Sequence, residues 1–437
     1  MKIGIHTENT SIGYRARLEY VLAFINRHPL IPDSLSFHLT DDSHSASLLY
    51  GVFSDEKISI KKAEYLFNQK KPSVYYLNKH LKGKHIFYSI GEFQSEEPIQ
   101  GKYIPFDLFE TIFFFLSRIE EIHLPYATYV GKKELFESKI VGVKSDITHV
   151  PVVDQLVVLL FEMVTSNKIH QKTTISISHD IDAIRKYNSP YAFIRKMGGQ
   201  LIHRKNISRW PIIWKQAREY PEHDPFDTSE WMLSKQQEQI KEIYFLVGGA
   251  HEEDNPYSFD DPIFNSFIKN AVDGGYHIGI HPSFESWQRP ELVLKEKNKL
   301  EKVLGKSITI SRQHFLNFDI LHTPKILESC GILKDSSIGF SRHVGFRSGT
   351  GFEHYLYDFD LEGPSILETP LVFMDVAGMY VCDWDGDRYL KLKQSFLSRN
   401  AYNTHITFLY HNTIFDEMEM RGYNIKKDYF NLIGNDK

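Results

Sequence analysis

The pattern of apolar and polar positions changes character near residue 169. Beyond it, short runs rich in β-branched and aromatic residues alternate with longer stretches in which apolar residues recur every three or four positions. Such alternation is typical of α/β proteins with a parallel sheet. Strands are predicted at residues 174–180, 242–248, 277–281, 308–314, 334–340, 366–373 and 404–411, and helices between them at 263–272, 290–304 and 387–398.

The first 168 residues follow a separate pattern. Strands are predicted at residues 2–6 and 85–90, and helices at 105–121 and 152–166, with no catalytic constellation among them. A chain of 437 residues is also too long for one ordinary core. We therefore predict a smaller α/β N-terminal domain over residues 1–168, followed over residues 169–437 by a (β/α)7 barrel. In such barrels the chemistry lies at the carboxyl ends of the strands.

Composition and charge narrow the function classes. The net charge of −5 gives no basic footprint, so we expect no nucleic-acid partner. Only two cysteines, Cys330 and Cys382, are present, which excludes a thiolate metal site and indicates a reducing compartment. No apolar run approaches the roughly 20 residues of a membrane span, and the N-terminus lacks an apolar leader. We expect a cytoplasmic protein, and the sequence leaves its oligomeric state open.

Two aspartates follow the first predicted strand of the barrel. Polar and apolar residues alternate over residues 174–182, so Asp180 and Asp182 emerge on the same face. Their Cα atoms would lie roughly 6.6 Å apart, at about 3.3 Å per residue. Two carboxylates this close can divide the work of metal-assisted hydrolysis, one binding a cation and the other accepting a proton from water. The alternative is an Asx turn that closes the strand.

Two histidines mark the third predicted strand. His277 and His281 have the i, i+4 spacing of helical zinc ligands, but Gly279 and Pro282 favour a strand. In a strand this spacing separates the Cα atoms by roughly 13 Å, which is too far for one metal ion. His281, at the carboxyl end, is therefore the candidate ligand, and we interpret His277 as structural.

The fourth and last predicted strands carry three more candidate residues. Alternation places Arg312 and His314 on one face, where a guanidinium could keep a metal-site carboxylate ionised and an imidazole could add a third ligand. His411 ends the last strand, a position suited to protonating a leaving amine or alkoxide. A surface ion pair and buried structural histidines are the alternative interpretation.

Together these residues resemble the polysaccharide deacetylase family, metal-dependent carbohydrate de-N-acetylases and esterases with a distorted seven-stranded (β/α) barrel. The resemblance covers residues 170–415 and is carried by segments 178–182, 275–281, 312–314 and 408–411. It implies Asp180 as the base, and Asp182 and His281 as ligands of a divalent metal, with zinc expected. Arg312 matches the arginine that orients the base, and His411 matches the general acid.

The chain departs from the family at the third metal ligand. Where the family has a second histidine four residues after the first, this chain has Glu285. Either Glu285 binds as an oxygen donor, or His314 supplies the missing nitrogen, or the metal is bound weakly or not at all. We favour His314, because its predicted position at a strand tip faces inward beside Arg312. The backbone N–H of Phe315 falls where the family places an oxyanion donor.

The resemblance predicts a metal-dependent hydrolase that removes an N- or O-acyl group, expected to be acetyl, from a carbohydrate substrate. A cytoplasmic location favours a glycan precursor in surface polysaccharide synthesis. Two alternatives stay open: a non-catalytic carbohydrate-binding protein on a degenerate deacetylase barrel, and a scaffold protein. The N-terminal domain resembles segments that precede deacetylase barrels in some bacterial proteins, which brings no established activity with it.

Overall fold

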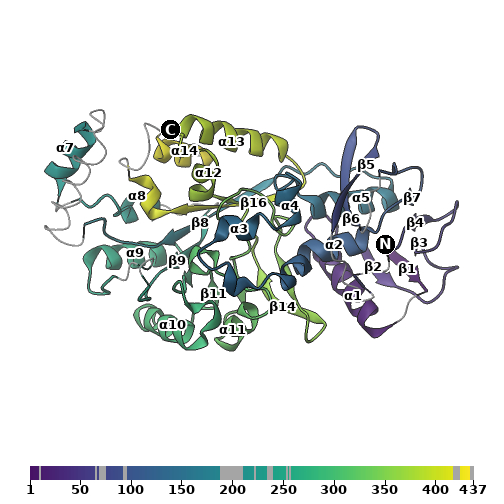
Figure 1. Ribbon diagram of the computed structural model, residues 1–437, viewed down its shortest axis with the longest axis horizontal. Helices are drawn as coiled ribbons and strands as arrows, with labels where there is room; N and C mark the ends of the chain where they lie inside the picture. The colour runs from purple at the N-terminus through teal and green to yellow at the C-terminus, as the bar shows by residue number, and fades with distance from the viewer. Residues whose placement is uncertain are drawn as a thin grey trace.

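The computed structural model contains two sheets, one parallel and one mostly parallel, and a separate hairpin (Figure 1). The smaller sheet and the hairpin are built from residues before 105, and the larger sheet from residues after 173. The structure describes residues 1–8, 11–63, 66–67, 75–91, 96–187, 210–220, 223–233, 240–251, 254, 257–416 and 424–433.

The N-terminal sheet has five parallel strands in the order β2-β1-β3-β4-β7. These strands are β1 (Lys2–Thr7), β2 (Ser36–Leu39), β3 (Leu48–Tyr50), β4 (Ile58–Ile60) and β7 (Tyr103–Ile104). The hairpin consists of β5 (Tyr76–Lys82) and β6 (His85–Gly91). The strands predicted at residues 2–6 and 85–90 are confirmed by β1 and β6.

Helices α1 (Ile12–Arg27), α2 (Leu108–Ser117) and α5 (Val152–Thr165) share one apolar core with this sheet. Every residue of α2 is buried, as expected for a helix that is apolar on all sides. The carboxylate of Asp107 caps it by accepting the N–H of Glu110 at 2.8 Å. Short elements follow as η1 (Ile119–His123), η2 (Tyr126–Thr128), α3 (Lys133–Glu137) and α4 (Val141–Lys144). The helices predicted at 105–121 and 152–166 are thus confirmed, the first with a break after Ser117.

The larger sheet is a curled half-barrel of nine strands, β13-β14-β12-β11-β10-β9-β8-β16-β15. All neighbouring strands are parallel except β13 and β14. The strands are β8 (Thr174–Ile181), β9 (Ile240–Phe245), β10 (His277–Ile280), β11 (Ile310–Ser311), β12 (Lys334–Asp335), β13 (His354–Asp358), β14 (Gly363–Glu368), β15 (Phe373–Met374) and β16 (His405–His411). The mixed α/β architecture is confirmed. The closed (β/α)7 barrel stays a prediction.

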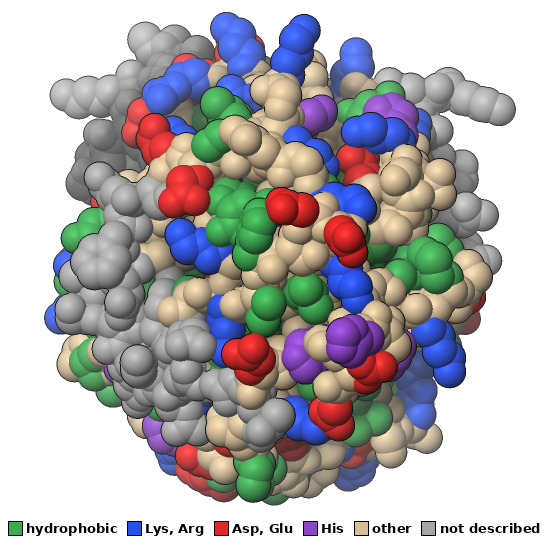
Figure 2. Space-filling view, turned by 90° about the vertical axis from the view of Figure 1, so that its right-hand side faces the viewer, with side chains coloured by type: hydrophobic (Ala, Val, Ile, Leu, Met, Phe, Trp, Pro, Cys, Tyr) green, Lys and Arg blue, Asp and Glu red, His purple; other side chains and the backbone are tan. Residues whose placement is uncertain are grey.

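Helices pack around this sheet and bury its outer face in one large apolar core. They are α8 (Ser229–Leu233), α9 (Pro262–Asp273), α10 (Pro290–Leu304), α11 (Thr323–Ser329), α12 (Asp375–Val381), α13 (Gly386–Arg399) and α14 (Ile425–Leu432). A further helix, α7 (Trp210–Glu219), lies at one end of the molecule (Figure 1). The three helices predicted from periodicity correspond to α9, α10 and α13. Among the described helices, none has both the length and the apolar character needed to cross a membrane. At the end of the molecule that carries the N-terminal sheet, acidic and basic side chains are interspersed (Figure 2).

A buried histidine ties the C-terminal helix to the sheet and makes stability depend on pH. The ring of His179 contacts the carbonyl oxygen of Tyr410 and the hydroxyl of Tyr429 in α14, each at 3.0 Å. Burial lowers the pKa of His179 from 6.5 to about 4. Because the unfolded chain binds this proton more readily, the stabilisation is present above pH 6.5 and is lost as pH falls toward 4.

We expect the stability of the wild type to fall by about 2.5 kcal/mol more than that of His179→Gln between pH 7 and 4.5. Urea denaturation at the two pH values measures the difference. Replacement of the exposed His85 by glutamine should leave the wild-type pH dependence in place. If the stability of the wild type and of His179→Gln depended equally on pH, His179 would not be the source of the pH dependence.

Candidate metal centre

The candidate residues meet because parallel strands end at a common edge of the sheet. β11, β10, β9, β8 and β16 are consecutive neighbours, and His411 of β16 lies in register with Asp180 of β8. His281 directly follows β10, and Arg312 directly follows β11. The four side chains therefore come from the carboxyl ends of strands that lie side by side, as predicted.

Asp182, His281 and His314 form a cluster with the composition of a metal site. One ligand atom from each lies within 4.8 Å of the other two. The Oδ1 atom of Asp182 is buried without a hydrogen-bond partner, and it lies 3.4 Å from Nε2 of His281. A buried carboxylate oxygen without a donor is costly unless a cation compensates it. One carboxylate and two imidazoles are also the donor set that zinc accepts in hydrolases.

Both histidines of the cluster are oriented by a second group. His281 donates from Nδ1 to the carbonyl oxygen of Arg312 at 2.5 Å. Nδ1 of His314 lies 3.0 Å from Oδ1 of Asp254. In each ring the Nδ1 contact leaves Nε2 as the available ligand atom, the arrangement found around metal-bound histidines.

Asp180 is held beside the cluster by a buried arginine. Nη1 of Arg312 donates to Oδ1 of Asp180 at 2.8 Å, and Nη2 donates to the hydroxyls of Ser178 and Ser336, both at 2.8 Å. The guanidinium also lies over the ring of Tyr244, 4.4 Å from its centroid. The second oxygen of Asp180 is 3.7 Å from Nε2 of His281. One oxygen of Asp180 is thus engaged, and the other faces the cluster.

His281 lies near Oδ1 of Asp182, whereas His411 faces Oδ2 of the same carboxylate. The ring of His411 is held by Asp375 at the start of α12. Oδ1 of Asp375 contacts Nδ1 of His411 at 2.7 Å, and Oδ2 accepts its backbone N–H at 2.7 Å. Nε2 of His411 lies 3.7 Å from Oδ2 of Asp182. Burial opposes protonation of the ring, but Asp375 and Asp182 outweigh it and raise the pKa of His411 to about 10.

The site as a whole favours positive charge. Burial would raise the pKa of Asp182, but His411, His281 and His314 lower it well below its usual range. Burial likewise lowers the pKa of His281, and Asp180 and Asp182 raise it to a larger extent. In the absence of a metal ion, protons on His281 and His411 balance the carboxylates, and a divalent cation can take over that role.

Glu285 lies away from the cluster. After Pro282 the chain enters the turn η4 (Ser286–Gln288), which carries Glu285 to the surface. Its side chain is 56% exposed and pairs with Arg289 at 3.4 Å. Of the two candidates for the third ligand, only His314 is brought to Asp182 and His281.

Two functional candidates were missed from the sequence. Asp375 lies two residues beyond the strand predicted at 366–373, so an extended search past strand ends could have found it. Asp254 lies in an irregular stretch after β9, where no periodicity marks it.

Residues that precede the larger sheet in the chain support the loop that carries His314. This loop contains η5 (His314–Leu316), in which Phe315 and Leu316 have φ angles of 57° and 52°. Lys133 of α3 donates to the carbonyl oxygen of Leu316 at 2.8 Å and to the hydroxyl of Tyr126. The same hydroxyl accepts the N–H of Phe318 at 3.1 Å. Because the left-handed region is unfavourable for these side chains, the buried contacts help to hold the loop in place.

We expect Lys133→Met to weaken zinc binding by roughly tenfold, because loss of an indirect support of a ligand typically costs ten- to a hundredfold in metal affinity. Methionine keeps the unbranched chain but removes the donors to Leu316 and Tyr126. Competition for zinc with a chromogenic chelator measures the change. Lys132→Met, at the exposed neighbouring position, is the matched control. Equal zinc affinity in the two variants would contradict the supporting role.

Residues 6–169 match the model of a family of unknown function, DUF7033. A comparison with curated proteins finds no match. The matched segment ends before β8 and therefore before every residue of the cluster. It includes Tyr126 and Lys133, which contact the loop of His314.

Proposed function

We propose that the protein is a zinc-dependent hydrolase of the polysaccharide deacetylase type, which removes an acetyl group from a carbohydrate. The observation that carries the proposal is the cluster of Asp182, His281 and His314 beside an aspartate held by a buried arginine. The resemblance of segments 178–182, 275–281, 312–314 and 408–411 to that family supports the same activity. In this proposal the curled sheet serves as the family's distorted (β/α) barrel.

Asp182, His281 and His314 would hold the metal ion, which when bound supplies a Lewis acid for the acyl carbonyl and for water. Asp180 accepts the proton of the attacking water as that water adds to the acyl carbon. Arg312 donates to Oδ1 of Asp180, which leaves the other carboxylate oxygen directed at the water. Glu285 takes no part in this proposal.

His411 completes the reaction on the other side of the acyl group. When the carbon–nitrogen or carbon–oxygen bond breaks, the imidazolium donates its proton to the departing amine or alkoxide. Asp375 holds the ring in position and stabilises its positive charge. The backbone N–H of Phe315 is the proposed donor to the oxyanion. The products are acetate and a sugar with a free amino or hydroxyl group, for which a glycan precursor is the proposed source.

The activity is tested by acetate release from N-acetylglucosamine oligomers and from O-acetylated oligosaccharides. We expect release to fall more than tenfold after chelation and to return when one equivalent of zinc is restored. Unchanged turnover in metal-free protein would contradict the metal-dependent mechanism. Binding of these glycans by zinc-loaded protein without any acetate release would favour the non-catalytic carbohydrate-binding protein.

A further inference from the structure

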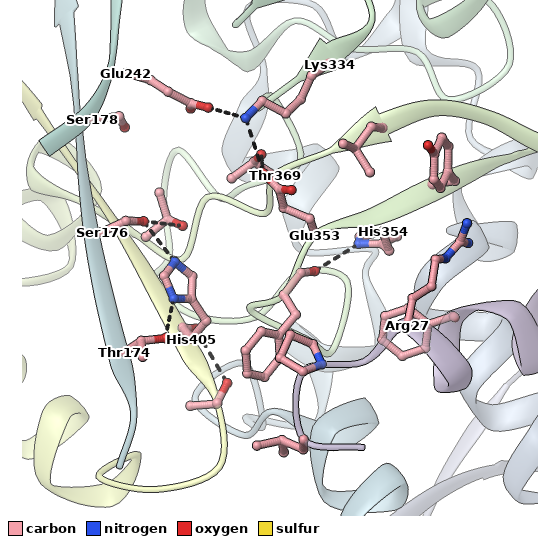
Figure 3. Close-up of a pocket in the computed structure, with 18 of the residues that line it drawn as sticks. Arg27, Thr174, Ser176, Ser178, Glu242, Lys334, Glu353, His354, Thr369 and His405 are labelled. Carbon is pink, nitrogen blue, oxygen red and sulfur yellow. Dashed lines mark hydrogen bonds and ion pairs between the residues drawn. The ribbon is translucent and has the colours of Figure 1, made fainter. Parts of the chain in front are cut away.

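A cavity lies where β8 and β16 of the large sheet begin (Figure 3). The metal cluster lies at the other end of these strands. The cavity has a volume of about 660 Å³, within the range of pockets for small molecules. Thr174 opens β8 at this cavity, whereas Asp180 lies six residues further along the same strand, roughly 20 Å away at 3.3 Å per residue. The cavity is also lined by His277, which lies at the start of β10, whereas His281 directly follows the end of that strand.

One wall of the cavity is a ladder of hydroxyl and imidazole groups across β8 and β16. His405 lies between Thr174 and Ser176, with its Nδ1 2.7 Å from one hydroxyl and its Nε2 2.8 Å from the other (Figure 3). The hydroxyl of Ser176 also contacts that of Thr407 at 3.2 Å. Burial lowers the pKa of His405, so this wall is neutral. Each hydroxyl has one donor and two acceptor positions, which leaves capacity for a ligand.

A second wall carries one lysine and two carboxylates. Lys334 pairs with Glu242 at 2.5 Å and with Glu353 at 3.2 Å. The hydroxyl of Thr369 donates to Glu353 at 2.8 Å. Because the one lysine is shared by two carboxylates, this wall offers hydrogen bonds without a net positive charge that would select an anion.

The third wall comes from the end of α1, from β13 and from the residues just before β13, and it carries aromatic rings. Phe24, Phe352 and Tyr355 line it, and the guanidinium of Arg27 lies 4.8 Å from the ring centroid of Tyr355. The ring centroid of Phe352 lies 6.1 Å from that of His405, so apolar rings adjoin the hydroxyl ladder. This combination matches a sugar, which has apolar C–H faces and a polar rim of hydroxyl groups.

We propose that this cavity binds a neutral saccharide of one or two units, at a site separate from the metal cluster. The proposal stands on the three walls of the cavity and does not depend on deacetylase activity. The inner end of the cavity reaches Ser178, whose hydroxyl accepts a hydrogen bond from Arg312 at 2.8 Å. A sugar in contact with Ser178 would therefore be linked through this hydroxyl to Arg312, which also donates to Asp180.

Saturation-transfer NMR and calorimetry on the full chain test the site with glucose, N-acetylglucosamine and maltose, and with glucose 6-phosphate as the anionic counterpart. We expect a neutral probe to bind, and both His405→Leu and Ser176→Val to weaken that binding at least tenfold. His85→Leu is the control for loss of an exposed histidine. Asp182→Asn, which removes a carboxylate from the metal cluster, should leave the binding unchanged.

The proposal fails if no neutral probe binds, if only glucose 6-phosphate binds, or if binding survives both His405→Leu and Ser176→Val. Loss of binding in Asp182→Asn with full binding in the two cavity variants would place the sugar at the metal cluster instead. Absence of zinc-dependent acetate release would contradict the proposed hydrolase but would leave this binding result unaffected.

Discussion

Asp180→Asn is expected to lower turnover by about 10² to 10⁴-fold while zinc binding is retained, because a positioned general base contributes that much to a rate. Asparagine has the same shape as aspartate and can still accept a hydrogen bond from Arg312, but it cannot take the proton of water. The metal ligands Asp182, His281 and His314 stay in place. Acetate release and elemental zinc analysis on the same preparation measure the two effects.

Asp260→Asn serves as the matched control, since it makes the same substitution at an aspartate that is exposed in a turn. It should change neither turnover nor zinc content. Loss of zinc in Asp180→Asn would make Asp180 a metal ligand. Full turnover in this variant would remove it from the reaction.

Arg312→Met should destabilise the protein by about 3 to 5 kcal/mol, the usual cost of removing one partner of a buried ion pair. Arg312 is completely buried, and its guanidinium holds Asp180, Ser178 and Ser336. Without it Oδ1 of Asp180 loses its cationic partner, and His281, 3.7 Å from the other oxygen, compensates the buried carboxylate only in part. The free energy of unfolding in urea measures the loss.

A double variant separates the ion pair from simple packing. Arg312→Met combined with Asp180→Asn should be more stable than Arg312→Met alone, because the unpaired charge is then absent. Arg289→Met, at an arginine that is 46% exposed, should change stability by less than about 0.5 kcal/mol. A double variant no more stable than Arg312→Met would contradict the electrostatic explanation.

Strand ends were predictable from the sequence because the apolar runs are short and bounded by polar residues. All seven predicted runs after residue 169 overlap strands of the larger sheet. Parallel strands bring their carboxyl ends to one edge of the sheet. The sequence alone therefore predicted that four side chains would lie close together: Asp180, His281, Arg312 and His411. β13 was missed because it is an antiparallel edge strand, which the alternating strand–helix pattern does not anticipate.

The path of the chain beyond a strand was not predictable. The left-handed residues Phe315 and Leu316 turn the chain directly after His314, and η4 takes Glu285 outward. Both paths depend on tertiary contacts, such as the hydrogen bond from Lys133 to Leu316, which join residues distant in the sequence. The choice between His314 and Glu285 therefore needed the structure, as did the carboxylates of Asp254 and Asp375.

The most direct test of the account is the zinc content of the purified protein, measured by elemental mass spectrometry for the wild type, His314→Ala and Glu285→Ala. We expect close to one zinc per chain in the wild type and in Glu285→Ala, and loss of most of it in His314→Ala. Wild-type protein that binds no zinc even after zinc is added would contradict the proposed metal centre and the hydrolase built on it.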